Sequence, residues 1–368
     1  MKFALFYGGR SVEHDWSIAM YEHTAHHINM SGNSLEKLRA IIYLAANGEI
    51  FLYRTQGQIA PAHGDVLTRG DVIPIEDLPS VLKELGAFVF SLLQGQDGED
   101  GQMQAIAQFF DVPGSFGSKS AAMLATDKYL QSRFVEAEFR DLSPIPTVCV
   151  DPYQLDESVP LLQSTIGAGP CVAKPNTLGG SFMTQAFRSL ADFDIQAYAA
   201  RLKHYDDRFL VQSRISGVEY TCGIISRDGA YAPLPVATIE TPSHFFGCEQ
   251  KVTPGLYNVS FCDQEAPVCG RIRQVSSRIA KLFDVHTFCR LDFIVDSNGN
   301  IHFFEMNIVP GLTAGSIFPK MLAKAGLHLL DLISISFDNE QIRRRRELRK
   351  RKATSKTRFG RSLQALAS

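Results

Sequence analysis

The stretch Cys289–Asn307 reads CRLDFIVDSNGNIHFFEMN and decides the fold of this 368-residue chain. Two apolar runs flank the dipeptide Asn298-Gly299, which is the strongest short-range signal for a tight turn between antiparallel strands. We expect a two-residue loop in which Ser297 faces Asn300. The segment therefore predicts a β-hairpin.

The register of this hairpin sets polar side chains against one another. Counting back from the loop places Asp292 opposite Glu305 and Arg290 opposite Asn307. All four share one face, because strand side chains alternate. Opposed carboxylates have Cβ atoms ~5 Å apart and repel unless a positive charge lies between them. We expect Asp292, Glu305 and Asn307 to be oxygen ligands of Mg²⁺. The alternative, an exposed hairpin with ordinary surface charges, is disfavoured by the flanking phenylalanines.

The first third of the chain has a different pattern from the hairpin region. Apolar runs at 3–7, 40–45 and 87–93 indicate buried strands, and helical spacing follows from Ser17 and over 102–110. Strands that alternate with helices indicate a mostly parallel sheet, with functional sites at the carboxyl ends of the strands.

The rest of the chain is richer in strands. A middle segment has a helix at 127–137 and strands at 147–151 and 171–174. From residue 208 onward short apolar runs follow one another, interrupted by an amphipathic helix at 274–283. The antiparallel pairing expected there gives a fold class of α/β and α+β.

These changes of pattern predict three folded units and a tail. We expect an N-terminal α/β substrate domain at 1–117, a central subdomain at 118–208 and a C-terminal subdomain with the metal site at 209–336. The remaining segment, 337–368, is expected to be a basic tail.

Three further motifs could carry chemistry. In AKPNTLGGS, Lys174 ends an apolar strand before a Gly-rich turn, which can hold phosphate, although a hairpin loop with a surface lysine would look the same. In GGRSVEHD, Glu13 either holds a substrate ammonium or is an acid at a helix start. In VPGLTAGS, the turn at Gly311 and the hydroxyl of Ser316 suit an anion, although Ser316 could be a plain helix N-cap.

Composition restricts the class of protein. No apolar run reaches the ~20 residues that span a bilayer, so no membrane association is expected. Seven cysteines without a Cys-x-x-Cys pair argue against a disulfide framework or a zinc site and indicate a reducing cytoplasm.

The net charge of −2 hides eleven Lys/Arg and one Glu between Arg343 and Arg361. This basic block either binds an anionic partner or lies as a solvated, partly helical tail against its own acidic body, and we favour the second.

The motifs taken together resemble one enzyme family. GGRSVEHDWS, GEDGQMQ, ATDK, AKPNTLGGS, SGVEYT, RLDF, FFEMN and VPGLTAGSIFPK follow one another as in the D-alanine–D-alanine ligases, from residue 1 to about residue 335. The resemblance implies an ATP-grasp fold and a reaction in which ATP activates a carboxylate as an acyl phosphate for attack by an amine. It also implies a homodimer that acts on amino acids or related small molecules.

The resemblance implies roles in binding and joining the substrates. Glu13 would hold the ammonium of the first amino acid, and Ser316 would hold the carboxylate of the second. Arg290 and the Gly311 backbone would stabilise the tetrahedral oxyanion. Lys251 would lie near the γ-phosphate in a mobile loop.

The resemblance likewise implies a nucleotide and metal site. Lys128, Lys174 and the phosphate-loop residue Ser181 would contact ATP phosphates. Gln212 would face the adenine amino group and Glu219 the ribose. Two Mg²⁺ ions, with Mn²⁺ as a possible substitute, would bind Asp292, Glu305 and Asn307.

The sequence also departs from the family pattern. The first serine of the family's Gly-Ser-Ser-x-Gly loop is Gly180, and the tyrosine to which that serine links the glutamate is Val252. The usual histidine before the GEDG motif is Gln94. Near adenine, the family's acid and the lysine that follows it are Gln212 and Ser213.

Three functions therefore remain open. The leading hypothesis is an ATP-dependent amide-forming ligase, either a divergent D-alanine–D-alanine ligase or a relative that makes another dipeptide or depsipeptide. A nucleotide-binding pseudoenzyme with a regulatory role would explain the lost serine, tyrosine and histidine. Nucleic-acid binding by the basic tail is not expected, because no aromatic residue is interleaved with the charges before Phe359.

Overall fold

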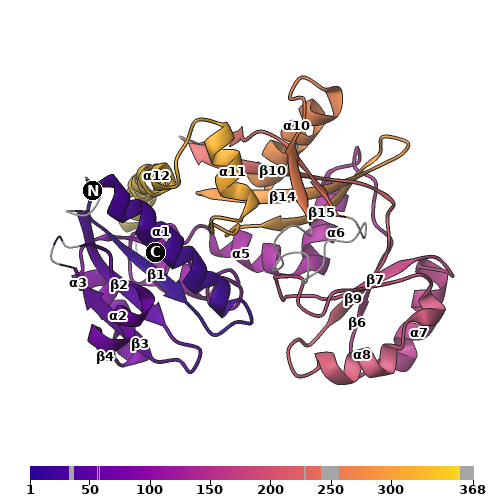
Figure 1. The fold of residues 1–368 in the computed structure, drawn as a ribbon, viewed down its shortest axis with the longest axis horizontal. Helices are drawn as coiled ribbons and strands as arrows, with labels where there is room; N and C mark the ends of the chain where they lie inside the picture. The colour runs from indigo at the N-terminus through magenta and orange to yellow at the C-terminus, as the bar shows by residue number, and fades with distance from the viewer. Residues whose placement is uncertain (33–36, 56, 58, 228, 242–256, 357–368) are drawn as a thin grey trace, which may run out of the picture.

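The computed structural model describes residues 1–32, 37–55, 57, 59–227, 229–241 and 257–356. The chain forms three β-sheets, each with its own helices (Figure 1). The N-terminal unit lies at the left of this view, the C-terminal sheet at the upper right and the central unit at the lower right. The predicted combination of α/β and α+β organisation is confirmed.

The N-terminal sheet has the strand order β4-β3-β2-β1-β5. Its parallel part is β2-β1-β5, and these strands are almost wholly buried, as the apolar runs predict. The elements are β1 Phe3–Gly8, α1 His14–Ser31, β2 Leu38–Leu44, β3 Ile50–Arg54, α2 His63–Arg69, β4 Asp71–Ile73, η2 Ile75–Asp77, α3 Leu78–Glu84, β5 Phe88–Ser91 and α4 Gln102–Phe109.

The expectation of a mostly parallel sheet is only partly right, because β3 and β4 add two antiparallel pairs. The β2–β3 hairpin turns at Asn47-Gly48, where Gly48 has a φ of 91°. The buried Ser17 links the carboxyl ends of the parallel strands β1 and β5. Its hydroxyl accepts a hydrogen bond from the Gly8 N–H at 2.8 Å and donates one to the Leu92 carbonyl at 2.6 Å.

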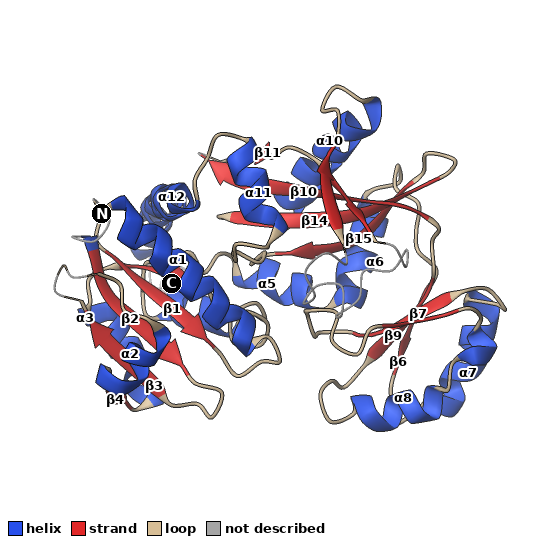
Figure 2. Cartoon of the chain, viewed as in Figure 1, coloured by secondary structure: helices blue, strands red, loops and turns tan. Residues whose placement is uncertain are grey.

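The central unit is an antiparallel sheet with the strand order β6-β9-β7-β8, and its outer face is covered by two helices (Figure 2). Helices α5 and α6 precede it in the chain and pack against the C-terminal unit. The elements are α5 Lys119–Thr126, α6 Lys128–Glu138, β6 Thr147–Val150, α7 Leu155–Thr165, β7 Cys171–Pro175, β8 Gln185–Phe187, η3 Leu190–Asp192, α8 Ile195–Leu202 and β9 Phe209–Ser213.

The C-terminal sheet has the order β13-β12-β10-β14-β15, with β11 paired to β10. Helix α10 packs on one face, and α11 packs on the other, beside the polar residues of β10 and β14. The elements are β10 Gly217–Arg227, β11 Ala230–Pro233, β12 Ala237–Glu240, β13 Asn258–Phe261, α10 Pro267–Leu282, β14 Phe288–Asp296, β15 Ile301–Asn307, α11 Ile317–Lys324 and α12 Leu329–Lys356.

The hairpin β14–β15 pairs Asp292 with Glu305 and Arg290 with Asn307, as predicted. The expected two-residue loop, however, is wrong. Asp296 pairs with Asn300 around a three-residue loop, which shifts the register by one residue. A β-bulge beside Asp292 shifts it back, since Phe293 pairs with Phe303. The two irregularities cancel, so the residues at the site face each other as a regular hairpin would place them.

The basic segment continues a helix that begins in the folded core. Helix α12 lies beside α1 and the N-terminal sheet, where Phe337 makes an edge contact with Phe88. Arg351 forms an ion pair with Asp111 at 2.9 Å, as expected for a basic helix held on an acidic body. Among the described residues no helix is long and apolar enough to cross a membrane.

Candidate active site

Two cavities meet where the three units converge. The first, of about 200 Å³, lies between the N-terminal and C-terminal units, and the second, of about 150 Å³, lies between the central and C-terminal units. Six residues line both cavities: Lys128, Gly179, Gly180, Arg290, Glu305 and Asn307. A ligand in either cavity therefore touches the same central residues.

The carboxylate of Asp292 accepts several hydrogen bonds at this junction. It is 2% exposed and accepts Nε and Nη2 of Arg290 at 3.0 and 2.8 Å. It also accepts the Thr221 hydroxyl at 2.6 Å and Nδ2 of Asn307 at 3.2 Å. These four donors use the roughly four lone-pair positions of a carboxylate. Arg290 is thus the positive charge that two opposed acids require.

The same ion pair fixes the protonation state of Arg290. Burial by itself would lower the pKa of this guanidinium, but the charges of Asp292, Glu305 and Glu219 raise it well above its ordinary value. Arg290 therefore stays charged while it lines both cavities. A buried, permanent cation at this position can stabilise negative charge that develops on a bound ligand.

The bulge in β15 gives the second cavity an aromatic wall. Phe304 is the residue left over when Asp292 pairs with Glu305 and Phe293 pairs with Phe303. Phe304 and Glu305 both line the second cavity. The ammonium of Lys174 lies 4.2 Å from the centre of the Phe304 ring, which is a cation–π contact. Lys174 is 3% exposed, so the alternative of a surface lysine is wrong.

The Gly-rich loop between β7 and β8 closes the second cavity. Three of its residues have a left-handed backbone: Gly180 at φ 62°, Ser181 at 57° and Met183 at 52°. Such a conformation is readily adopted by glycine but costs ~1 kcal/mol or more for other residues. Strain of this kind concentrates in ligand-binding loops.

The loop is anchored to helix α6 through Asn176. The carbonyl of Asn176 accepts the Lys128 N–H at 3.1 Å, and its side chain accepts the Tyr129 N–H at 3.0 Å. The Lys128 ammonium donates to the Leu178 carbonyl at 2.7 Å. Lys128 and Lys174 consequently lie in one cavity although they are far apart in the sequence.

Two polar residues lie farther along the second cavity. Gln212 on β9 is 5% exposed, and its amide donates to the Thr147 hydroxyl at 2.9 Å. Glu219 on β10 lines the same cavity and pairs with Ile294 of β14. Both therefore line the same cavity as Lys128 and Lys174.

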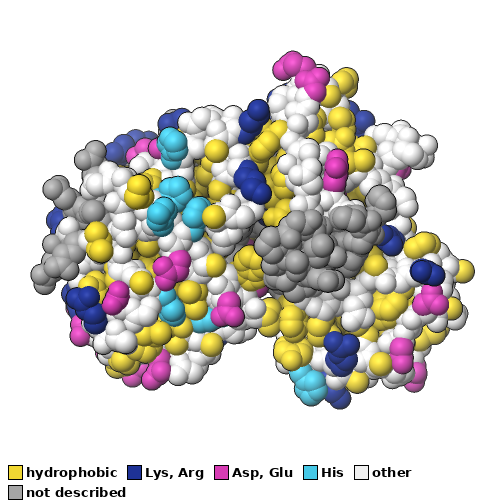
Figure 3. Space-filling view, viewed as in Figure 1, with side chains coloured by type: hydrophobic (Ala, Val, Ile, Leu, Met, Phe, Trp, Pro, Cys, Tyr) yellow, Lys and Arg dark blue, Asp and Glu magenta, His cyan; other side chains and the backbone are white. Residues whose placement is uncertain are grey.

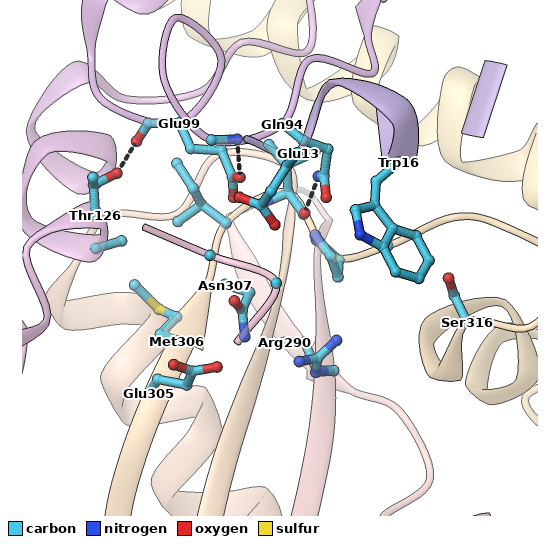
Figure 4. A pocket seen from close by; sticks show the side chains of 18 of the residues that line it. Glu13, Trp16, Gln94, Glu99, Thr126, Arg290, Glu305, Met306, Asn307 and Ser316 are labelled. Carbon is cyan, nitrogen blue, oxygen red and sulfur yellow. Dashed lines mark hydrogen bonds between the residues drawn. The ribbon is translucent and has the colours of Figure 1, made fainter. Parts of the chain in front are cut away.

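Glu13 lies at the start of α1 and forms one end of the first cavity (Figure 4). It is 9% exposed, and Gly179 in the loop between β7 and β8 lies against its carboxylate. A Cβ atom on Gly179 would lie 2.2 Å from Oε2 of Glu13. The N-terminal unit and the central loop are thus in contact through a carboxylate and a bare Cα. Side-chain capping of α1 by Glu13 is not seen.

A second acid, the half-buried Glu99, lies beside Glu13 (Figure 4). Its carboxylate accepts the Gly95 N–H at 2.7 Å and the Val309 N–H at 3.2 Å. Burial and the negative charge of Glu13 raise the pKa of Glu99 to about 8, against the lowering effects of the two N–H donors and of Lys128. At neutral pH Glu99 is therefore mostly protonated.

The segment after β15 closes the opposite end of the first cavity. The Ser316 hydroxyl lies 2.7 Å from Oγ1 of Thr313 and accepts the Thr313 N–H at 3.1 Å. A Cβ atom on Gly311 would lie 2.8 Å from the Ser316 oxygen, so a side chain at this position would displace the Ser316 hydroxyl. Ser316 occupies the N-cap position of α11 but makes no side-chain cap hydrogen bond. The Ser316 hydroxyl instead contacts Thr313 in the segment that lines the cavity. This position fits the predicted role of holding a carboxylate better than the role of a plain helix cap.

The structure brings the predicted site residues together. Every one that it describes lines one or both cavities: Glu13, Lys128, Lys174, Ser181, Gln212, Glu219, Arg290, Asp292, Glu305, Asn307, Gly311 and Ser316. Lys251 and Val252 lie outside the described residues.

Several residues at the site escaped the sequence analysis. Trp16 lines the first cavity and lies between Glu13 and Ser316 in the view of Figure 4. Trp16 is the only tryptophan of the chain and follows Glu13 by three residues, which places it within one helical turn of that acid. This spacing is the feature of the sequence that could have indicated it. Thr221 lies two residues after Glu219 on the same strand. Because strand side chains alternate between the two faces, this spacing could have predicted that both lie on one face.

Comparison with known proteins gives the family. The family model described as the D-Ala–D-Ala ligase C-terminus matches residues 156–336. A D-alanine–D-alanine ligase of Fervidobacterium nodosum is 30% identical over 264 residues, which cover 70% of this chain and 82% of the relative. The chain belongs to the D-alanine–D-alanine ligase family.

Solved structures of this family share the fold. The D-alanine–D-alanine ligase of Coxiella burnetii aligns with a TM-score of 0.72 at 21% identity, covering 96% of this chain and 99% of the other. The VanG D-Ala:D-Ser ligase of Enterococcus faecalis aligns with a TM-score of 0.71 at 21% identity, covering 92% and 99%. The predicted ATP-grasp fold is confirmed. The family assignment makes the protein an ATP-dependent ligase that forms a C–N bond.

The contact between Gly179 and Glu13 can be tested by Gly179→Ala. The added methyl group would lie 2.2–2.5 Å from the carboxylate atoms of Glu13. Glu13 must move, and a displacement of ~1 Å at a reacting site can lower the rate ~10²-fold. We expect kcat/KM, measured by substrate-dependent ADP release, to fall by about that factor while the circular dichroism spectrum is unchanged. The control is Gly270→Ala, where a Cβ meets nothing within 4 Å. Equal kcat/KM in the two variants would contradict the packing.

The raised pKa of Glu99 predicts a pH-dependent stability. Between the ordinary pKa of 4.5 and the folded-state value of about 8, the folded protein keeps a proton that the unfolded chain releases. The contribution of this proton to stability is complete below about pH 4.5 and is lost as the pH rises to about 8.

The test of this linkage is Glu99→Gln, which stays neutral at every pH. We expect the free energy of unfolding of Glu99→Gln, relative to the unmodified protein, to become more favourable between about pH 5 and about pH 8. Urea unfolding at both pH values measures the difference, with the exposed Glu265→Gln as control. A relative stability that stays constant or moves the other way would show that Glu99 is ionised in the folded state.

Proposed function

We propose that the protein is an ATP- and Mg²⁺-dependent ligase that joins the carboxylate of one amino acid to the amine of a second amino acid or related compound. We further propose that at least one substrate differs from D-alanine. The observation that carries the proposal is the contrast between the two cavities. The second cavity keeps the lysines for phosphate and the oxygen ligands for metal, and its departures from the family pattern, Gln212 and Ser213, lie near the expected adenine position. The wall around Glu13 in the first cavity, by contrast, has changed where a substrate would bind.

The second cavity offers what a nucleotide requires. Lys128 and Lys174 supply positive charge, and the loop at Ser181 supplies backbone N–H groups for phosphate. Gln212 and Glu219 lie farther along the cavity and would face the base and the ribose. We therefore assign this cavity to ATP.

Asp292, Glu305 and Asn307 fit Mg²⁺, since two carboxylates and an amide oxygen are hard oxygen donors beside an open cavity. Turning the Asn307 amide would free a lone pair of Asp292 and present the Asn307 oxygen. Among the described residues no group of three or more His, Cys, Asp or Glu side chains could hold a metal alone, so phosphate and water oxygens would complete the shell. Bound there, Mg²⁺ would neutralise phosphate charge during phosphoryl transfer.

The residues shared by the cavities would carry the joining reaction. A substrate carboxylate oxygen bonds to the γ-phosphorus of ATP, and ADP leaves with the electrons of the broken P–O bond. The amine of the second substrate then bonds to the acyl carbon, and phosphate leaves as the amine gives up a proton. Arg290 and the Gly311 N–H would stabilise the oxyanion formed in that step. Ser316 would hold the carboxylate of the second substrate.

The first cavity supports an altered substrate. Gly180 removes the family's serine, and its Cα lies where a Cβ would be 3.9 Å from the Trp16 indole nitrogen. Gln94 replaces the family's histidine, and its amide donates to the Val309 carbonyl at 2.6 Å. The groups around Glu13 thus differ in shape and hydrogen bonding. That a structural neighbour is a D-Ala:D-Ser ligase is consistent with varied substrates on this fold.

A substrate screen tests the altered-substrate proposal. ADP and phosphate release would be measured over pairs of D- and L-amino acids and hydroxy acids. We expect turnover with a pair other than two D-alanines to exceed turnover with D-alanine alone. Robust activity with D-alanine only would overturn the altered specificity, and ATP binding without any substrate-dependent hydrolysis would favour the regulatory pseudoenzyme.

The metal assignment is tested by Glu305→Gln, which removes a negative oxygen ligand but keeps the size of the side chain. We expect kcat to fall by about two to three orders of magnitude, comparable with the loss of a key electrostatic group, while the thermal unfolding temperature without ligands changes little. The control is Glu157→Gln on the exposed face of α7. Full activity of Glu305→Gln at limiting Mg²⁺ would exclude Glu305 as a ligand.

A further inference from the structure

A pair of histidines, His23 and His27, lies in the second half of α1. His23 and His27 are four residues apart, so their side chains stand one turn apart on the same helix face. Their Nε2 atoms lie 3.1 Å from each other, and the ring planes are nearly perpendicular at 88°. Histidine side chains gather on this part of the molecular surface, above α1 (Figure 3).

The hydrogen bond on the other side of His23 fixes its tautomer. Nδ1 of His23 lies 2.7 Å from the Leu312 carbonyl oxygen, which can only accept, so Nδ1 carries the proton. In the neutral imidazole Nε2 then has a lone pair, and that lone pair faces His27. A histidine ligand whose second nitrogen donates to a backbone carbonyl is the usual arrangement around protein-bound metals.

The distance between the two Nε2 atoms suits a bound ion. Metal–imidazole bonds are about 2.0–2.1 Å long, so nitrogens 3.1 Å apart would subtend roughly 100° at a metal between them. That angle lies between tetrahedral and octahedral values. Two histidines at i and i+4 of a helix are a known metal-binding arrangement.

We propose that His23 and His27 form a site for a divalent transition-metal ion such as Zn²⁺, distinct from the Mg²⁺ site. Imidazole nitrogen selects Zn²⁺, Ni²⁺ or Cu²⁺, whereas Mg²⁺ takes oxygen ligands. Both rings are half-buried, and water reaches the site from the α1 surface. With two protein ligands and the remaining positions held by water, the ion exchanges readily. Without metal, a proton shared by the two Nε2 atoms holds the rings together.

The hydrogen bonds of the two rings are compatible with a metal bound between their Nε2 atoms. When the ion binds, the His27 proton on Nε2 moves to Nδ1, and His23 keeps its proton on Nδ1. The bond to Leu312 is therefore retained in the metal-bound state.

The site is connected to the first cavity through Leu312. This residue is wholly buried and lies between Gly311 and Thr313, which both line that cavity. An ion on Nε2 of His23 prevents the tautomer that would break the bond from Nδ1 to Leu312. Metal binding would therefore hold the segment that carries Gly311 in place.

The test is Zn²⁺ binding to the full chain, with Mg²⁺ in large excess to occupy the oxygen site. Equilibrium dialysis would compare the unmodified protein with His27→Gln and with the control His204→Gln, an exposed histidine outside α1. We expect one Zn²⁺ in the unmodified protein and the control, bound at least about tenfold more weakly in His27→Gln.

Two further measurements separate metal binding from general damage to the fold. Zn²⁺ should raise the Tm of the unmodified protein and of His204→Gln but not that of His27→Gln. Cu²⁺ bound to the unmodified protein should show two nitrogen couplings in its electron paramagnetic resonance spectrum, and one in His27→Gln. Equal Zn²⁺ affinity in all three proteins, or no binding to any, would overturn the proposal. Neither result depends on ligase activity.

Discussion

The buried ion pair between Arg290 and Asp292 is the constraint on which the rest of the site depends. Removing one partner of such a pair leaves an uncompensated buried charge, which costs about 3–5 kcal/mol. The pair is stable because donors from two other positions, Thr221 and Asn307, complete the shell of the carboxylate. Three strands, β10, β14 and β15, must therefore keep their register for the charge to be satisfied. The polar network orients the residues that both cavities share, so stability of the sheet and geometry of the site have a common origin.

The second constraint is the close approach of three units around this pair. The N-terminal unit contributes Glu13, and the central unit contributes the loop at Gly179. The Glu13 carboxylate lies against the Gly179 backbone, where a side chain would leave no room for it. Close approach of this kind requires glycine, and the left-handed backbone at Gly180 favours glycine as well. The loss of the family's serine is therefore compatible with the local backbone. The loop retains strain at Ser181 and Met183, which indicates that its conformation is held by its surroundings.

Much of this arrangement could be predicted from the sequence, because the hairpin has a strong local signal and opposed residues follow from counting. The pairing of Asp292 with Glu305 is right although the loop length is wrong, since the bulge at Phe304 restores the register. Bulges leave no such signal, and so the aromatic wall of the second cavity was not predicted. Asn47-Gly48 carries the same turn signal as Asn298-Gly299, yet the antiparallel β2–β3 hairpin was missed. The contacts of Glu99 depend on the tertiary approach of Val309, which no local pattern encodes.

The charge at the first cavity bears on what the altered wall can select. Glu13 and Glu99 lie together, and burial and the charge of Glu13 raise the pKa of Glu99, so Glu99 keeps its proton to a higher pH than an ordinary glutamate. Under the proposed function these acids would bind a substrate ammonium group, and its recognition would not need the family's serine or histidine. The replacements at Gly180 and Gln94 introduce no charge, and Trp16 adds a large apolar surface to the same cavity. Under the proposed function these changes would act on the shape of the cavity around the substrate amino group, so we expect an altered specificity to concern the side chain of the first substrate rather than its charge.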